Sequence, residues 1–259
     1  MKAIKIDLPR ELESAEIHPI SDLHIGDKHC RMDIIKERLE KIAAKDNAYI
    51  ILNGDIINNA TKTSVSDCYA EELSPMQQIE RFVELFVPLK DRVLCADSGN
   101  HENRTYLTQG IDITQICMRE LGIEDRYTKN GAVLFVRLGS GSSHDHNRPV
   151  RYTFYCNHGG GGGGRKEGAK AIRLADMASI IDVDIYVHGH THLPMVMKQA
   201  FYRVDPCNST LYKVDKLFVN TAAALDYGGY GEQYEFKPSS TDSPTIYING
   251  RKKHFSASL

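Results

Sequence analysis

The sequence predicts an α/β fold with parallel strands, and two observations carry this prediction. An apolar strand over residues 16–20, an amphipathic helix over 32–44 and a second apolar strand over 49–52 follow one another along the chain. Strand, helix and strand in this order favour a right-handed parallel crossover. Polar residues follow each of the two strands directly, and ligands of open α/β sheets bind beyond such strand ends. We therefore expect a functional site at that edge of the sheet.

The remaining elements follow from the spacing of apolar residues. Ser74 followed by Pro75 indicates a capped helix start, and apolar residues continue at helical spacing to Leu89. Further helices are predicted over residues 111–121 and 169–181. Strands are predicted over residues 92–96, 132–138, 150–156 and 183–187, and antiparallel strands over 195–204, 211–219 and 245–248. No long linker divides the chain, so we expect a single domain over residues 1–259.

Composition places the chain among ordinary globular proteins. Hydrophobic residues make up 41% and charged residues 25% of its 259 residues, and the net charge is -2. This balance gives no overall basic field for nucleic acid or an anionic membrane, although it does not exclude a local basic groove. The N-terminus lacks a signal-peptide apolar run and no stretch is long enough to span a bilayer, so we expect a cytoplasmic protein without a membrane partner. The six scattered cysteines are typical of reduced thiols.

Three histidines stand within five residues at the end of the strand over 183–187. His190 and His192 are two residues apart, so on an extended segment they project to one side and can converge on a metal cluster. The alternative is that each ring is a hydrogen-bonded surface or core side chain. His188 belongs to the strand that precedes the motif, and we expect it to pack in the core.

Polar residues of a restricted set follow five of the predicted strands. The five blocks are Asp22-Leu23-His24, Gly54-Asp55, Gly99-Asn100-His101-Glu102, Asn157-His158-Gly159 and Gly189-His190-Thr191-His192. Their carboxylate, imidazole and amide groups suit one or two divalent ions of borderline hardness, such as manganese, iron, zinc or nickel. The absence of a thiolate from the set argues against a structural zinc site.

These five blocks, in this order from Asp22 to His192, resemble the signature of the calcineurin-like metallophosphoesterase superfamily. Five short motifs in a fixed order are far more specific than any one of them. The resemblance implies a four-layer αββα sandwich of two mixed sheets flanked by helices. It also implies a centre of two divalent metal ions that cleaves a phosphoester bond.

The resemblance assigns seven metal ligands to this chain. Asp55 would bridge the two metals, and the other six form two sets: Asp22, His24 and His192 for the first metal, and Asn100, His158 and His190 for the second. Two ions about 3.5–4 Å apart generate a hydroxide near neutral pH and stabilise the entering and leaving oxygens at phosphorus. By the same resemblance, His101 donates a proton to the leaving oxygen or stabilises its charge, and Glu102 orients His101.

Two further groups are candidates for substrate binding. Arg104 either clamps a phosphate oxygen or forms a surface ion pair. The glycine run over residues 159–164, which includes Gly160 and Gly161, leads into Arg165. This run is either an anion-binding nest beside the metals or a mobile loop.

The sequence therefore predicts a metal-dependent hydrolase that acts on a phosphomonoester or phosphodiester, with a nucleotide or nucleic acid as the expected substrate. A nuclease acting on DNA or RNA is the main alternative. A Ser/Thr-type protein phosphatase is disfavoured because Asp55 is followed by Ile56 and Ile57, where those enzymes usually carry an arginine-glycine pair. A metal-binding module without catalysis is disfavoured because both His101 and Glu102 are present. The oligomeric state does not follow from the sequence.

Overall fold

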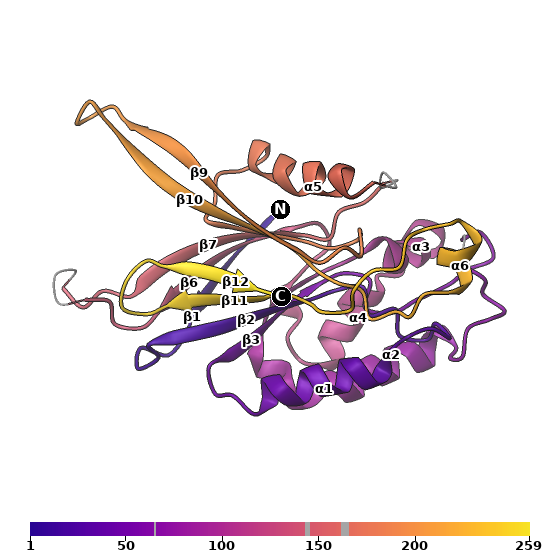
Figure 1. The fold of residues 1–259 in the computed structure, drawn as a ribbon. Helices are drawn as coiled ribbons and strands as arrows, with labels where there is room; N and C mark the ends of the chain where they lie inside the picture. The colour runs from indigo at the N-terminus through magenta and orange to yellow at the C-terminus, as the bar shows by residue number, and fades with distance from the viewer. Residues whose placement is uncertain (65, 143–145, 162–165) are drawn as a thin grey trace.

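The computed structural model describes residues 1–64, 66–142, 146–161 and 166–259. Within these residues the strands form two mixed sheets of six strands each (Figure 1). The strands of the first sheet are, in spatial order, β1 (Lys2–Asp7), β6 (Ala132–Leu138), β7 (Val150–Asn157), β8 (Ile185–His188), β10 (Thr210–Asn220) and β9 (Met195–Asp205). Those of the second sheet are β12 (Phe255–Ser258), β11 (Thr245–Asn249), β2 (Ser14–Ile20), β3 (Ala48–Asn53), β4 (Val93–Asp97) and β5 (Tyr127–Thr128).

The helices lie mostly in the connections between strands. The α-helices are α1 (Met32–Ala43), α2 (Pro75–Phe86), α3 (Asn100–Gln109), α4 (Ile113–Glu120), α5 (Glu167–Asp176) and α6 (Gly229–Gln233), and the 3-10 helices are η1 (Val87–Arg92), η2 (Glu124–Arg126) and η4 (Met177–Ser179). The predicted start of α2 is confirmed, because Ser74 and Gln77 form a capping box with Pro75 in the first turn. Among the described residues, no helix is both long enough and apolar enough to cross a membrane.

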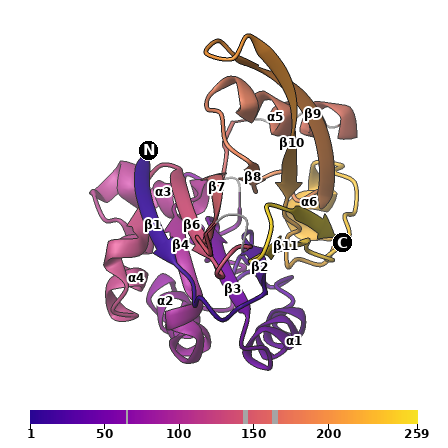
Figure 2. The ribbon, with the colours of Figure 1, turned by 90° about the vertical axis from the view of Figure 1, so that its left-hand side faces the viewer.

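Three apolar clusters divide the molecule into four layers. Ile51 and Phe154 are fully buried between the two sheets. Helices α1, α2 and α4 cover the outer face of the second sheet, where Phe82 and Cys117 are fully buried. Helix α5 covers the outer face of the first sheet through Leu174. Figures 1 and 2 show these helices on opposite sides of the paired sheets, so the predicted four-layer sandwich is confirmed.

Parallel pairing brings the ends of the central strands to one edge. Strands β2, β3 and β4 are parallel neighbours, which confirms the predicted crossover through α1. In the other sheet, β8 runs parallel to both β7 and β10. The five polar blocks follow the carboxyl ends of β2, β3, β4, β7 and β8. The two sheets therefore present these blocks at a shared end of the sandwich.

The structure contains elements that the sequence patterns do not reveal. Helix α3 begins at Asn100, inside the third polar block, and its buried residues are His101 and Glu102, so no apolar stripe marks it. Strand β12 pairs with β11 at the edge of the second sheet. Of the three predicted antiparallel strands, β9 and β10 form a hairpin in the first sheet, whereas β11 pairs with β2 in the second.

Candidate metal centre

The loops after the strands contain unusual backbone conformations. Asp22, His24, Asp55, His190 and His192 have φ angles of 53°, 47°, 49°, 63° and 56°. Positive φ is uncommon for residues that carry a side chain, and each such residue costs about 1–3 kcal/mol. These five residues are all predicted metal ligands. The surrounding structure holds them in a strained conformation at the point where chemistry is expected.

Two glycines permit the close packing of these loops, for different reasons. Gly54 has a φ of 76°, and a Cβ atom there would lie 2.7 Å from the ring of His158. Gly99 has an extended backbone, with φ -94° and ψ -176°, but a Cβ atom there would overlap the carboxylate and amide nitrogen of Asp55. A tight turn with positive φ is therefore present at Gly54, whereas Gly99 is required because two loops meet at its Cα atom.

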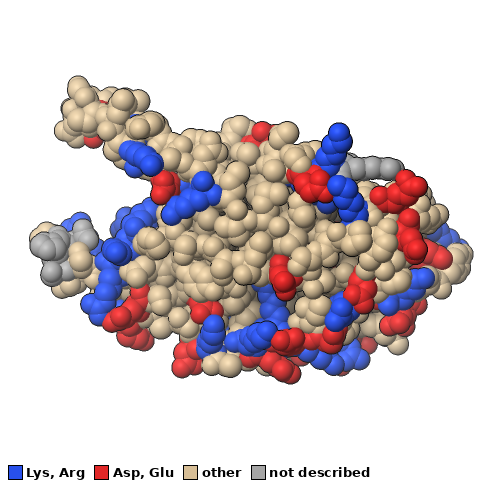
Figure 3. Space-filling model, viewed as in Figure 1, with Lys and Arg blue, Asp and Glu red and all other residues tan. Residues whose placement is uncertain are grey.

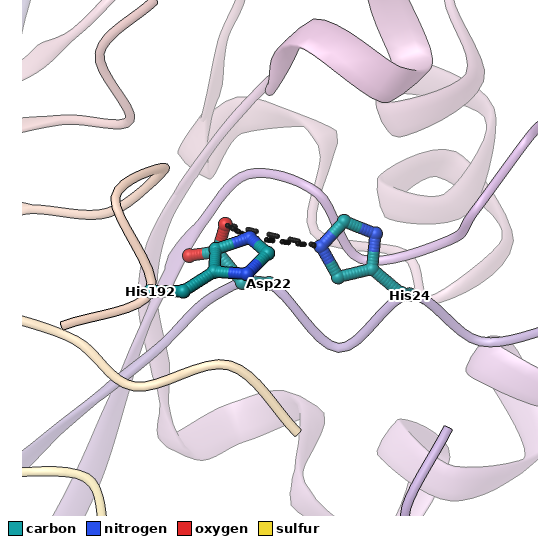
Figure 4. A group of neighbouring side chains, drawn as sticks. All are labelled: Asp22, His24 and His192. Carbon is teal, nitrogen blue, oxygen red and sulfur yellow. Dashed lines mark hydrogen bonds and ion pairs between the residues drawn. The ribbon is translucent and has the colours of Figure 1, made fainter. Parts of the chain in front are cut away.

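Asp22, His24 and His192 form the first cluster of ligand atoms (Figure 4). Nε2 of His192 lies 3.1 Å from Oδ1 of Asp22 and 3.2 Å from Nε2 of His24. Asp22 and His24 are buried, whereas the side chain of His192 is 35% exposed. Ser21 and the backbone N–H of His190 bind the other carboxylate oxygen of Asp22. Oδ1 of Asp22 is therefore left to face the two rings.

Asp55, Asn100, His158 and His190 form the second cluster. Oδ2 of Asp55 lies 3.2 Å from Nε2 of His158. Oδ1 of Asn100 lies 3.2 Å from the same nitrogen and 2.7 Å from Nδ1 of His190. Asp55 also groups with His24 of the first cluster, so it lies between the two clusters. The structure thus brings all seven predicted ligands together from five strand ends.

Hydrogen bonds on the far side of two rings fix the nitrogen that faces the second cluster. His158 donates from Nδ1 to the carbonyl of Asn53 at 2.7 Å. His190 donates from Nε2 to the carbonyl of Gly161 at 2.8 Å. A carbonyl oxygen only accepts hydrogen bonds, so the opposite nitrogen of each ring faces the cluster and presents a lone pair to it once that nitrogen is deprotonated.

The first cluster shows a similar convergence of acceptor atoms. Nδ1 of His24 lies 3.3 Å from Oδ1 of Asn58, which turns Nε2 toward His192. Oδ1 of Asp22 is buried and has no hydrogen-bond partner among the described residues. Lone pairs that point at one another repel, and a cation placed among them removes that repulsion. Carboxylate, imidazole and amide oxygen donors in this arrangement fit a divalent metal ion.

The charged groups of the second cluster shift each other's pKa values strongly. Burial alone would raise the pKa of Asp55, but His158 and His101 hold that pKa well below its usual value. Burial alone would lower the pKa of His158, but Asp55 and Asp22 hold it well above its usual value. The carboxylates therefore keep a proton on His158, and a metal ion that binds Nε2 has to displace it.

The side chain of Glu102 makes different contacts from those that the implied role, orienting His101, would require. Its carboxylate accepts hydrogen bonds from backbone N–H groups, including those of Gly99 at 2.8 Å and Asp55 at 3.1 Å. The ring of His101 is instead oriented by the carbonyl of Asn58, which lies 2.6 Å from Nδ1. The expected role of Glu102 in orienting His101 is thus corrected. Because its oxygens bind loop amides, Glu102 joins the loop after β3 to the start of α3.

His101 and Arg104 lie one turn apart on α3 and contact each other. Since Nδ1 of His101 donates to the carbonyl of Asn58, Nε2 accepts a hydrogen bond from Nη2 of Arg104 at 3.0 Å. Nη1 of Arg104 donates to the same carbonyl at 3.1 Å. Burial, opposed by Asp55 and assisted by Arg104, lowers the pKa of His101 to about 4. The ring is therefore neutral near neutral pH, and the Arg104 guanidinium lies at the site.

The described part of the glycine run presents carbonyl groups to its neighbours. The carbonyl of Gly161 accepts the hydrogen bond from His190, and the carbonyls of Gly160 and Gly161 lie 2.9 and 3.3 Å from Nη1 of Arg173. The anion-binding prediction relied on amide N–H donors, so these contacts show a different use of Gly160 and Gly161. Arg165 lies outside the described residues.

Several residues that hydrogen-bond to the predicted ligands lie outside the five motifs. Asp97, at the end of β4, accepts a hydrogen bond from the backbone N–H of His158 at 3.0 Å. Asn53 and Asn58 set the orientation of ligand rings, as described above. His188 is buried as expected, and its Nδ1 lies 2.8 Å from Oδ1 of Asn220. The only sequence signal for Asp97 and Asn53 is that a polar residue ends an apolar strand.

The sequence of this chain was compared with models of known protein families, and the result agrees with the arrangement of the five blocks. The profile of the family described as calcineurin-like phosphoesterase matches residues 20–194, more than half of the chain. The chain belongs to this family. Membership supports a metal-dependent hydrolase that acts on phosphoesters, and the histidine and aspartate clusters support divalent metal binding. The matched segment contains every block from Asp22 to His192.

Three solved structures are similar to this chain at low sequence identity. A predicted phosphoesterase from Streptococcus pneumoniae TIGR4 is 14% identical, with a TM-score of 0.39 over 92% of this chain and 85% of that chain. A single mutant of Vps29 from Entamoeba histolytica is 14% identical, with a TM-score of 0.42 over 91% and 87%. A metallophosphoesterase from Sphaerobacter thermophilus is 14% identical, with a TM-score of 0.38 over 90% and 83%. No curated protein matches the chain.

Proposed function

We propose that this phosphoesterase hydrolyses phosphate esters of nucleotides or nucleic acids with a centre of two divalent metal ions. The observation that supports two ions is the position of Asp55, which groups with His24 on one side and with His158 and His190 on the other. The proposed ligands of the first ion are Asp22, His24, Asp55 and His192, and those of the second are Asp55, Asn100, His158 and His190. Manganese, iron, zinc or nickel would suit this donor set.

Residues next to the two clusters could bind the phosphate group of a substrate, in addition to the metal ions. When bound, the two ions supply a nucleophile at neutral pH and stabilise charge on the oxygens of the reacting phosphate. Arg104 presents a guanidinium beside the clusters, and a guanidinium matches two phosphate oxygens at once. Its present partner, Nε2 of His101, lies 3.8 Å from Oδ2 of Asp55. A phosphate bound next to Asp55 is therefore within reach of both side chains.

His101 is proposed as the proton donor to the leaving oxygen. Its lowered pKa leaves Nε2 unprotonated, and Arg104 donates to that nitrogen. A phosphate that engages Arg104 would free Nε2, and its negative charge would stabilise the imidazolium. Substrate binding would then raise the pKa of His101. The ring could carry a proton on Nε2 and release it to the leaving oxygen as the phosphorus–oxygen bond breaks.

The test is turnover by metal-reconstituted protein of an aryl phosphomonoester, an aryl phosphodiester and a single-stranded oligonucleotide. We expect the wild type to cleave at least one of them. His101→Ala should lose this turnover and keep its metal content, because His101 is outside the proposed ligand set. His18→Ala is the matched control, since His18 is a buried histidine of β2 whose described contacts are Glu16 and Thr245.

The preferred model substrate decides between the finer alternatives. Cleavage of the oligonucleotide with strongly salt-sensitive binding would identify a nuclease. Cleavage of an aryl ester alone would identify a small-molecule phosphoesterase. A wild-type chain that binds metal and cleaves none of the three would contradict the proposed hydrolysis. Full activity of His101→Ala would leave the hydrolysis in place and remove His101 from the mechanism.

A further inference from the structure

Strand β10 has two different environments along its length. Strand β9 pairs with all of β10, whereas β8 pairs only with its last part, from Leu217 to Asn220. Among the described residues, no strand therefore pairs with the segment 210–216 on the side away from β9. Figures 1 and 2 show this half of the hairpin extending beyond the rest of the molecule.

The free edge of β10 carries backbone groups that can pair with another strand. Leu217 donates its N–H to the carbonyl of Asp184 at 2.9 Å, on the side away from β9. Backbone groups alternate in direction along an antiparallel strand, so Asp215, Lys213 and Leu211 also direct their N–H and C=O groups away from β9. These pairs of groups are about 7 Å apart, which is the spacing that an added strand meets.

A groove of about 430 Å³ lies along this edge. Residues 212–216 form one wall, and Val183, Asp184 and residues 253–255 also line it. Neighbouring residues of a strand point to opposite faces of a sheet, so five consecutive residues in one wall indicate that the strand edge forms it. Figure 3 shows the hollow below the hairpin with lysine and arginine side chains at its border.

The charges on this edge complement a second copy of the same edge. Lys213 and Asp215 are two residues apart and exposed, so they project from one face of the hairpin. A two-fold axis at Val214 places Lys213 directly opposite Asp215 of the partner subunit and Asp215 opposite the partner's Lys213. The same axis brings the outward backbone groups of these residues into register. We propose that two copies of this chain associate by antiparallel pairing of their β10 edges.

Apolar side chains near the tip of the hairpin gain cover in this arrangement. Leu211 is 67% and Tyr212 46% exposed. In the register centred on Val214, the paired stretch runs from Tyr212 to Lys216. It ends there because Asp184 already accepts the outward N–H of Leu217, so the partner's Leu211 lies just beyond the paired stretch. Covering these side chains removes apolar surface from water. A closed two-fold contact also satisfies an edge that is otherwise open to uncontrolled pairing.

Light scattering and sedimentation of the full chain across the micromolar range test this contact. The wild type should show a concentration-dependent dimer. Lys213→Asp places like charges opposite each other at two symmetric contacts, and it should weaken association by about tenfold. Asp215→Lys should do the same. The exchanged double variant, Lys213→Asp with Asp215→Lys, restores opposite charges and should restore the dimer.

Matched controls separate this contact from other effects of charge. Lys5→Asp changes an exposed lysine on β1, at the other edge of the same sheet, and should leave the dimer unchanged. Lys198 forms an exposed ion pair with Asp215 at 3.6 Å, so the series is repeated with Lys198→Met to remove that pair. Unchanged unfolding temperatures show that the hairpin remains folded in each variant.

Three results would overturn the proposed dimer. One is a wild type that stays monomeric over the whole range. Another is a dimer that tolerates Lys213→Asp. The third is a double variant no better than either single variant in both backgrounds. None of these outcomes bears on hydrolysis, because the ligands follow the carboxyl ends of the strands whereas Lys213 and Asp215 lie toward the tip of the hairpin.

Discussion

The two clusters of the metal centre differ in what holds their rings. In the second cluster, His158 and His190 donate to main-chain carbonyls at 2.7 and 2.8 Å. In the first cluster, His24 relies on the side-chain amide of Asn58 at 3.3 Å. His192 is 35% exposed, and its Nδ1 has no hydrogen bond to the described residues. The second cluster is therefore the more preorganised of the two.

The two clusters have similar ligands, and they differ in the groups that hydrogen-bond to the ligand rings. Main-chain carbonyls are fixed by the strands and loops to which they belong, and no side-chain substitution removes them. A side-chain amide can move, and it can be replaced. Removing a group that orients a ligand histidine typically lowers metal affinity by about 10–100-fold. We therefore expect the second cluster to bind its ion more tightly and the first to exchange its ion more readily.

Asp55→Asn abolishes the difference between the clusters and has the largest expected effect. The substitution removes the carboxylate that both proposed sites share, so both should lose metal. Turnover should fall by about three orders of magnitude, because several kcal/mol of transition-state stabilisation are lost. Steady-state kinetics and metal analysis of the dialysed protein measure these changes. Asp184→Asn, at the opposite end of β8, should retain both properties.

Single-histidine substitutions separate the clusters. His192→Ala should lose the ion of the first cluster and keep the ion of the second, since the second cluster has its own ligands. His158→Ala should lose the ion of the second cluster, because it removes a buried ligand that bonds to both Asp55 and Asn100. Metal content after dialysis, with His18→Ala as control, measures the difference. Because the first cluster is expected to hold its ion less tightly, His158→Ala should retain less metal after dialysis than His192→Ala, and equal retention would contradict the proposed ranking.

Asn58→Ala tests the weaker support of the first cluster. Without the amide oxygen, His24 loses the group that orients its ring, and the affinity of the first cluster should fall by about 10–100-fold. The second cluster should be unaffected, because its rings bond to Asn53 and Gly161. Competition with a chelator gives both affinities. Thr245→Val removes one polar partner of His18, the group at Nδ1, and should change neither affinity.

The pH dependence of metal binding should also differ between the clusters. Nearby carboxylates hold the pKa of His158 well above its usual value, whereas burial and the neighbouring His101 hold the pKa of His24 well below it. Binding at the second cluster therefore displaces a proton, and its affinity should rise by about tenfold per pH unit below the pKa of His158. Calorimetry of His192→Ala in buffers of different ionisation enthalpy counts the protons. Release of none would refute this account.

The sequence by itself determined which residues end the strands. Apolar runs that stop at Asp22, Asp55 and His190 are local patterns, and the order of the blocks is specific to one family. The capped start of α2 and the first parallel crossover were readable for the same reason. These features depend on the near neighbours of each residue along the chain, so they need no knowledge of the packing.

Only the tertiary structure decided how those residues are held. Asn53 orients His158 across 105 positions of the chain, and the carboxylate of Glu102 binds the amide of Asp55 across 47. Helix α3 is stabilised at its start by the contacts of Glu102 and carries no apolar stripe. The free edge of β10 likewise results from where β8 begins beside it. Each of these features depends on which strands and loops become neighbours, and the order of strands in a sheet is not a local property of the sequence.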